Sequence, residues 1–366
     1  MKLKINDHIQ IIKHKMNKHI QKKKFLGCLT MLLLVCLSGC AKQTPQAEPY
    51  DGEKYVAVAN TTEAFENKEE FAKGFEPVTN YDERLSVPTY ITKYDDTWFI
   101  VDCYHNRIIY SDTLGIPLNQ WKIMTGDVTQ PHTIASDGVV YLVDDTENNR
   151  VQVFEKVDSK FINTQTIYNI GNRPHYTIYD KATDTFYVWS STTGEMYLFR
   201  HTADSSLMYL TEVRKIDALN GIYVRSFSII DGDIYFVSSV SEAGTPGRIY
   251  QCDLNSFEIK KEIPVPDTLA GMVQITRIQN YYYITTSTDL SGDQNHATIV
   301  RTPSLSELSK GNYEDIYAQY FIGGGTPYYI SEVDGTYFLT EHRLKDHSIW
   351  SFKVEKNKIT DVTALY

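Results

Sequence analysis

Two histidines, His132 and His175, each follow a proline and lie 43 residues apart. A neutral imidazole can bind a divalent metal through one ring nitrogen, and it can also hydrogen-bond to an anionic ligand. If the fold brings the two side chains together, they can serve a metal or a small anion. Arg173 and Arg225 would then make their surroundings locally basic. The alternative is that both histidines hydrogen-bond to neighbouring backbone.

A second pattern, Asp289-x-Ser291-x-Asp293-x-Asn295, places oxygen-bearing side chains at alternate positions, as a calcium loop does. It has Gln294 where the EF-hand turn needs glycine, so an ordinary solvated loop is favoured. The sequence contains no Gly-x-Ser-x-Gly elbow, phosphate loop, dinucleotide fingerprint or Cys-x-x-Cys pair. A complete catalytic set is therefore missing from the sequence motifs.

The two histidines occupy equivalent places in a sequence repeat. Three clear copies span residues 87–112, 130–155 and 173–200, and three looser copies span residues 225–253, 274–302 and 326–354. Each copy contains four short strands, with turns rich in Asp and Gly and with Tyr, Phe and Val in the strands. Such a period is typical of a β-propeller, and six units of about 47 residues fit residues 85–366. A two-sheet sandwich is the alternative, but it would not need a 43-residue period.

The second copy resembles an NHL repeat. In PHTIASDGVVYLVDDTENNRVQVFE a strand ends in Asp and an Asn-Arg-Val turn leads into the next strand, and HNRIIYSD at residues 105–112 echoes this pattern. The resemblance implies an all-β, divergent six-bladed propeller. NHL-type propellers include peptidyl-hydroxyglycine amidating lyases, whose channel zinc is held by histidines at such positions. Only His132 and His175 match that arrangement, so a possible divalent metal would lack a third histidine.

Propeller topology predicts where a ligand would bind. The starts of the inner strands and the ends of the second strands ring one mouth of the central channel. The inner-strand starts are placed at Thr89, His132, His175, Arg225, Gln274 and Tyr328, and the second-strand ends at Asp102, Asp144, Ser190, Ser238, Thr285 and Thr340. The predicted ligand-binding residues are His132, His175, Arg173, Arg225, Gln274, Tyr104 and Tyr328. We expect the two histidine side chains to lie on the order of 6–10 Å apart.

The N-terminus has the pattern of an export signal. Residues 1–24 carry eight lysines, and the apolar run at residues 25–37 is too short to span a bilayer. The run ends in Leu-Ser-Gly-Cys40, which resembles a lipobox, whose cysteine becomes a lipidated mature N-terminus. We expect a signal peptide over residues 1–39 and a lipidated tether over residues 40–54, anchored to the cell membrane on its extracytoplasmic side. A chance cysteine after an ordinary signal is the alternative, and Met16 is an alternative start.

Residues 55–84 are predicted to form a short strand at 55–59 and a helix over 61–73, between an Asn60 cap and Gly74. The propeller would occupy residues 85–366. Cys103 and Cys252 fall in non-adjacent repeats, so no disulfide is expected between them.

Charge and composition narrow the function. Without residues 1–39 the chain keeps 28 basic and 45 acidic residues, a net charge of about −17, which disfavours nucleic-acid binding. One hypothesis is a monomeric, surface-anchored binding or scaffolding propeller for a small-molecule or protein ligand, with a small anionic ligand at the channel mouth. The alternative is an extracellular metal-dependent lyase or lactonase-type enzyme.

Overall fold

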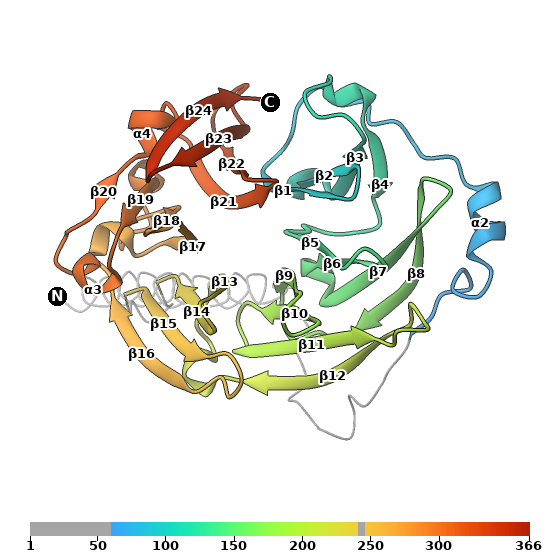
Figure 1. Cartoon of the computed structure of the whole chain (residues 1–366), viewed down its shortest axis with the longest axis horizontal. Helices are drawn as coiled ribbons and strands as arrows, with labels where there is room; N and C mark the ends of the chain where they lie inside the picture. Colours follow the sequence, from blue (N-terminus) through green and yellow to red (C-terminus); the bar gives the residue numbers. More distant parts are fainter. Residues whose placement is uncertain (1–59, 241–245) are drawn as a thin grey trace, which may run out of the picture. The chain divides into compact units, whose positions relative to one another are not determined.

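The computed structural model describes residues 60–240 and 246–366, which form a ring of six β-sheets (Figure 1). All described residues belong to one compact unit. The predicted signal peptide, the lipidated tether and the strand at 55–59 lie outside the described residues. Within the described ranges, no helix has both the length and the apolar character needed to cross a membrane.

Each sheet is one blade of four antiparallel strands in chain order, with the first strand nearest the axis. The predicted six-bladed propeller is therefore confirmed. Blade one contains β1 (Pro88–Tyr94), β2 (Thr97–Asp102), β3 (Arg107–Ser111) and β4 (Lys122–Thr125). Blade two contains β5 (Ile134–Ser136), β6 (Tyr141–Asp145), β7 (Arg150–Val157) and β8 (Lys160–Tyr168). Blade three contains β9 (Pro174–Asp180), β10 (Thr185–Ser190), β11 (Glu195–His201) and β12 (Met208–Lys215).

Blades four to six follow the same plan. Blade four contains β13 (Val224–Ile230), β14 (Asp233–Ser238), β15 (Arg248–Asp253) and β16 (Ile259–Pro264). Blade five contains β17 (Met272–Ile278), β18 (Tyr281–Thr286), β19 (Thr298–Thr302) and β20 (Glu314–Asp315). Blade six contains β21 (Thr326–Val333), β22 (Thr336–His342), β23 (Ile349–Glu355) and β24 (Lys358–Ala364). The described helices are α2 (Lys68–Gly74), α3 (Leu305–Leu308) and α4 (Tyr317–Tyr320), with short 3-10 turns that include η1 (Cys103–His105) and η3 (Thr146–Asn148).

The hydrophobic core is divided into layers between neighbouring blades. In β10, Phe186 and Val188 pack against blade two, whereas Tyr187 and Trp189 pack into the layer shared with blade four. This follows from the two-residue period of a strand, which sends successive side chains to opposite faces. Because both faces of β10 are buried, apolar residues occupy successive positions of this strand. Cys103 and Cys252 are buried and free, as expected for cysteines in separate blades.

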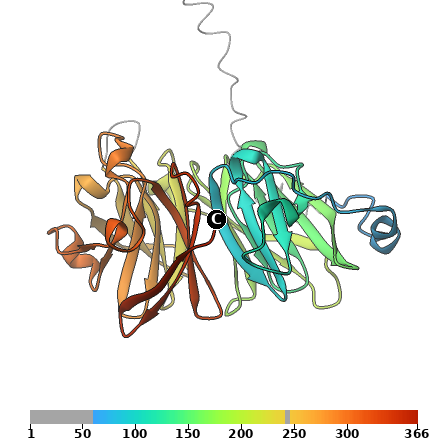
Figure 2. The same ribbon diagram turned by 90° about the horizontal axis from the view of Figure 1, so that it is seen from above.

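The ring closes between blades six and one without a shared strand. Ser331 Oγ of β21 donates a hydrogen bond of 2.5 Å to the Ile91 carbonyl of β1. The C-terminal Tyr366 lies against Trp121, with ring centroids 6.0 Å apart, and its hydroxyl accepts a hydrogen bond from Gly115 N. Figure 2 shows the C-terminus in the seam between these two blades.

The segment before the propeller runs along the outer strands of blades one and two. Thr62 N donates to the Thr164 carbonyl of β8 (2.9 Å), and Thr79 forms a bridge with Lys122 of β4. The predicted helix over 61–73 was wrong at its start, because α2 begins only at Lys68, with Asn67 as its cap. Pairing with β8 holds Asn60 to Thr62, and residues 63–66 form a turn before the helix.

Candidate functional site

Five inner strands carry a β-bulge at the same place near their start. The residues left without a partner in the pairing between the first and second strands are Thr89, His175, Arg225, Val273 and, in blade six, both Tyr328 and Tyr329. His132 takes this place in blade two, two residues before β5, by the 43-residue spacing. A bulge re-aims the side chain of the extra residue, so the repeat brings one side chain per blade to the channel.

A belt of hydrogen bonds holds these bulges in place, because each blade donates one side-chain bond to a backbone carbonyl of the next. In order from blade six, the bonds are Thr340 Oγ1 to Thr89 O (2.8 Å), Thr89 Oγ1 to His132 O (2.8 Å), Thr146 Oγ1 to Pro174 O (2.7 Å), His175 Nδ1 to Arg225 O (3.0 Å), Ser226 Oγ to Val273 O (2.6 Å) and Thr285 Oγ1 to Tyr328 O (2.6 Å). The belt is closed, so it links the entrances of the inner strands of all six blades.

The prediction for Gln274 was wrong by one residue, since Val273 is the bulged residue of blade five. The side-chain amide of Gln274 instead bonds to Ile330 N (2.7 Å) and Ile330 O (3.1 Å), and also to Tyr176 Oη (3.2 Å). Gln274 is buried and connects blade five to blades three and six rather than lining the mouth. Blade five lacks the proline that precedes this position in the first three blades, which is why the alignment shifted.

The aspartates of the NHL-like turns have a structural role. Asp102 accepts hydrogen bonds from Ser86 N (2.7 Å) and from the Arg107 guanidinium (2.7 and 3.0 Å). Asp145 does the same in blade two, with Thr129 N (2.7 Å) and Arg150 Nε (2.5 Å). Both carboxylates are fully buried. They tie the end of the second strand to the chain entering the first, so they are not available for catalysis.

The two predicted histidines do converge, and more closely than the sequence suggested. The rings of His132 and His175 stack with centroids 3.6 Å apart and an interplanar angle of 27°, instead of the expected 6–10 Å. Tyr328 continues the column, with its ring 6.1 Å from His132. We use "channel mouth" for His132, His175, Tyr223, Arg225 and Tyr328 together with Arg173.

Hydrogen-bond partners fix the tautomer of each histidine. His175 Nδ1 faces the Arg225 carbonyl, which can only accept, so Nδ1 carries the proton and Nε2 accepts from Tyr223 Oη at 3.0 Å. Thr146 donates its own hydroxyl proton to the Pro174 carbonyl, so it accepts from His132 Nδ1 at 2.8 Å. The remaining lone pair of His132, on Nε2, faces the Cys103 thiol at 3.8 Å.

Both histidines are neutral at physiological pH. Burial, together with smaller contributions from the charges of Arg173 and Arg225, lowers the pKa of His132 to about 3. Burial also holds the pKa of His175 well below its usual value, with contributions from His132 and the same two arginines. A buried base without an acidic partner gives up its proton because desolvation disfavours the charged form.

Arg225 is the distinctive charge of the mouth. It is half-buried, its guanidinium donates to Ser287 Oγ at 2.7 Å, and it lies 5.2 Å over the ring of Tyr223. No carboxylate among the described residues forms an ion pair with it. Burial lowers the pKa of His342 to about 4, with smaller contributions from the charges of Arg343 and Arg225. A guanidinium remains protonated under all ordinary conditions, so this positive charge persists.

The other predicted residues are placed differently. Arg173 acts on both histidines electrostatically, but its Nη1 pairs with Glu147 at 2.5 Å, and its buried Nε has no partner among the described residues. Tyr104 on η1 is 60% exposed, and no hydrogen bond or ring contact joins its side chain to either histidine in the part of the chain that the structure describes.

Sequence reasoning missed Tyr223, which holds one histidine and stacks under Arg225. It lies two residues before the bulge of blade four, the position that Arg173 occupies in blade three. Comparing the blades at that position would have identified it. Ser287, which accepts from Arg225, lies beyond the end of β18 and carries no repeat signal.

The histidine pair does not fit a metal centre in this arrangement. Two stacked rings direct their lone pairs side by side rather than toward one point, and the nitrogens already have partners. No group of three His, Cys, Asp or Glu side chains suited to a metal occurs among residues 60–240 and 246–366. In the calcium-like loop, Asp289 Oδ1 accepts from Ser291 N and Asp293 N, which is the turn chemistry of an ordinary loop.

The Cys103–His132 contact does not make an activated nucleophile. Burial raises the pKa of the Cys103 thiol far above its usual value, while His132 is a very weak base. The proton therefore stays on sulfur, and the thiol is buried. Reactive cysteines instead have a lowered pKa and solvent access.

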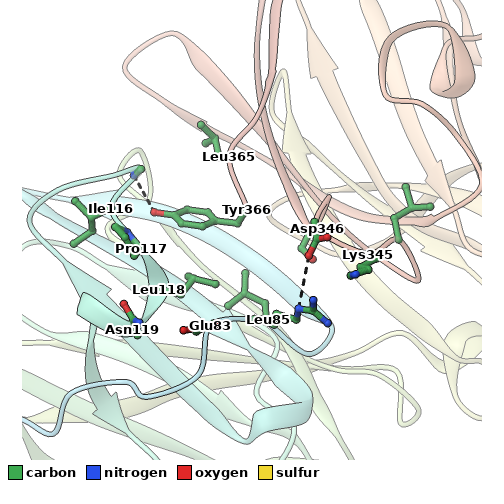
Figure 3. A pocket seen from close by; sticks show the side chains of 14 residues that line it. Glu83, Leu85, Ile116, Pro117, Leu118, Asn119, Lys345, Asp346, Leu365 and Tyr366 are labelled. Atoms are coloured by element: carbon green, nitrogen blue, oxygen red, sulfur yellow. Dashed lines mark hydrogen bonds and ion pairs between the residues drawn. The ribbon is translucent and has the colours of Figure 1, made fainter.

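Two further cavities lie away from the histidines. One, of about 560 Å³, lies in the seam between blades one and six, where Arg84 and Asp346 form an exposed ion pair of 3.7 Å beside Tyr366 (Figure 3). The other, of about 610 Å³, is lined by the far ends of β9, β13 and β17, and its Arg277 and Asp231 pair at 2.6 Å. In both, the opposite charges neutralise one another, so neither selects a ligand by charge.

A scan against protein-family models gives no match, and a search of curated protein sequences gives none either. Among solved structures, a proposed 6-phosphogluconolactonase from Bacteroides fragilis matches with TM-score 0.54 and 12% identity, over 76% of this chain and 84% of that one. A second, from Bacteroides uniformis, gives 0.52 and 13%, over 78% and 86%. Sqt1 of Saccharomyces cerevisiae gives 0.51 and 9%, over 79% and 88%. At such identities the likeness shows the β-propeller fold alone, on which enzymes and binding proteins are both built.

Proposed function

We propose that this protein is a ligand-binding propeller that takes a small anion at the channel mouth, and that a lipid on Cys40 anchors it to the extracytoplasmic face of the cell membrane. The observation that carries the first part is Arg225. It is a half-buried cation whose partners are a hydroxyl and an aromatic ring, with no carboxylate among the described residues.

The cost of a partly buried, unbalanced cation supports this proposal. Removing a charge from water is unfavourable unless a counter-charge compensates it. The nearby histidines avoid this cost because they are neutral, whereas Arg225 cannot lose its proton. An anionic ligand would supply the missing counter-charge. The mouth would also attract anions against the negative field of the rest of the protein, because a local cation dominates at short range.

The alternative function, a metal-dependent lyase or lactonase-type enzyme, has less support. Two of the similar folds are proposed 6-phosphogluconolactonases, but 12–13% identity carries over no activity. The nitrogens of His132 and His175 are engaged with neighbouring groups, and the thiol beside them is protonated. One tightly bound divalent ion per chain, found by metal analysis of the purified protein, would support the enzyme hypothesis instead.

Titration calorimetry tests the anion proposal. The full chain, purified in detergent, is titrated with acetate, malonate and inorganic phosphate at pH 7. We expect at least one of them to bind, and Arg225→Gln to weaken that binding at least tenfold, because hydrogen bonds to charged groups are worth about 1.5–3 kcal/mol. Arg277→Gln is the matched control, since Arg277 is paired with Asp231 away from the mouth. If every anion binds the Arg225 variant and the wild type equally, the proposal is wrong.

The anchoring proposal rests on the sequence Leu-Ser-Gly-Cys40 after a short apolar run. In bacteria that process lipoproteins, the wild-type protein should partition into the detergent phase, and Cys40→Ala should remain aqueous or unprocessed. Cys36→Ala, a cysteine within the apolar run, is the control and should behave as wild type. Equal partitioning of the mature wild-type and Cys40 variant proteins would refute lipid attachment at this residue.

A further inference from the structure

The seam cavity between blades one and six, of about 560 Å³, has a wall of apolar side chains (Figure 3). Its volume is typical of small-molecule sites, which hold roughly 300–1,000 Å³. The apolar residues that line it come from both blades and include Leu85, Ile116, Leu118, Leu344, Leu365 and Tyr366. Leu118 is buried, but the other leucines and Ile116 are only half-buried, so the cavity exposes apolar surface that a ligand would cover.

Two opposite charges lie at the rim of this cavity. Arg84 belongs to the segment that enters blade one, and Asp346 to the loop between β22 and β23 of blade six, and Arg84 Nε lies 3.7 Å from Asp346 Oδ1. Their side chains are 68% and 60% exposed, and neither has another polar partner among the described residues. The contact is longer than a hydrogen bond, and exposed ion pairs of this kind contribute little to stability. Both groups are therefore available to a ligand.

The balance of charge at the rim restricts the kind of ligand. Glu83 and Lys345 also line the cavity and are exposed, so the four charges of the rim sum to zero. A simple cation or anion therefore gains no net attraction from them. A ligand with one charge of each sign is different, because its carboxylate can bind Arg84 while its ammonium binds Asp346, so two ion pairs replace one long one. The closeness of these two side chains matches charges attached to the same carbon, as in an α-amino acid.

We infer that the seam cavity binds an α-amino acid with a large apolar side chain, with its carboxylate on Arg84, its ammonium on Asp346 and its side chain against the apolar wall. The cavity shares no lining residue with the channel mouth. The inference is therefore independent of the proposed anion-binding function, and either can fail without the other.

Calorimetry of the full chain in detergent at pH 7 tests this inference with L-phenylalanine and three compounds that each lack one part of it. 3-Phenylpropionate lacks the ammonium group, 2-phenylethylamine lacks the carboxylate, and glycine lacks the apolar side chain. We expect L-phenylalanine to bind at least tenfold more tightly than each of the three. If one of them binds as tightly as L-phenylalanine, or if L-phenylalanine does not bind, the inference is wrong.

Two variants show whether the ligand binds in the seam. Arg84→Gln and Asp346→Asn should each weaken L-phenylalanine binding at least tenfold, because each removes one charged contact. Both side chains are exposed, and asparagine tolerates the left-handed backbone of Asp346 (φ 62°), so both variants should fold, which circular dichroism checks. If one variant is unfolded, the other decides. Arg277→Gln, which breaks the ion pair with Asp231 in the other cavity, is the matched control and should bind as the wild type does. Equal binding of L-phenylalanine to the wild type and the folded seam variants would overturn the inference.

Discussion

Replacing His132 with glutamine should change how the stability of the protein depends on pH. His132 is 5% exposed, and its pKa is lowered to about 3 in the folded protein, against about 6.5 in the unfolded chain. Below pH 6.5 the unfolded chain therefore binds a proton that the folded protein does not. The stability that His132 contributes is fully present above pH 6.5 and is lost as the pH falls toward 3. Glutamine does not titrate, so the variant lacks this loss.

The size of the effect follows from linkage. Each pH unit is worth about 1.4 kcal/mol per proton, so between pH 6.5 and pH 5 the wild type should lose about 2 kcal/mol relative to His132→Gln. Guanidinium denaturation of both proteins at pH 8, 6.5, 5.5 and 5 measures the difference, and all other titrating groups cancel in the comparison. A difference that stays constant across this range would show that His132 titrates in the folded protein as it does in the unfolded chain. The neutral, stacked histidine pair would then be wrong.

The belt and the seam give further predictions. Thr340→Val removes the hydrogen bond from blade six to the buried Thr89 carbonyl, so it should lower the free energy of unfolding by about 1–3 kcal/mol in chemical denaturation. The control Thr363→Val, on the exposed last strand, should leave it almost unchanged. Tyr366→Ala removes the ring contact with Trp121 and the hydrogen bond from Gly115 N, so it should lower the free energy of unfolding by about 1–3 kcal/mol. Tyr366→Phe should lose only the hydrogen bond. Deleting residues 356–366 removes β24 and exposes an unpaired edge, so the product should aggregate or be proteolysed; a monomer as heat-stable as the parent would refute the closed ring.

The architecture was predictable because it is periodic. The prolines at 88, 131 and 174 precede the same inward-facing position in three blades, and the Asp-to-Arg spacing marks the same turn in two. Each feature recurs because the same backbone geometry recurs. Where blade five lacks the proline, the alignment slipped by one residue, and Gln274 was placed where Val273 lies. The helix start was missed for a different reason, because pairing with a distant strand, β8, overrides a local cap signal.

The chemistry of the site was predictable only in part. The sequence indicated that His132, His175 and Arg225 would meet, since equivalent positions of adjacent blades converge on the axis. It could not indicate that the two rings stack at 3.6 Å, or that Tyr223 occupies one imidazole nitrogen. It also could not show that Arg173 finds Glu147 while Arg225 finds no carboxylate among the described residues. These facts depend on side-chain contacts between blades, which the spacing of residues in the sequence does not predict.

The most direct test of the anion site is nuclear magnetic resonance of the protein labelled with 15N-arginine. The Nε–H signal of Arg225, assigned from its absence in Arg225→Lys, is followed while acetate, malonate or inorganic phosphate is added at constant ionic strength. We expect this signal to shift and saturate, while the signal of Arg277, paired with Asp231, stays in place. An Arg225 signal that does not move, or that moves only as much as those of all other arginines, would contradict anion binding at the channel mouth.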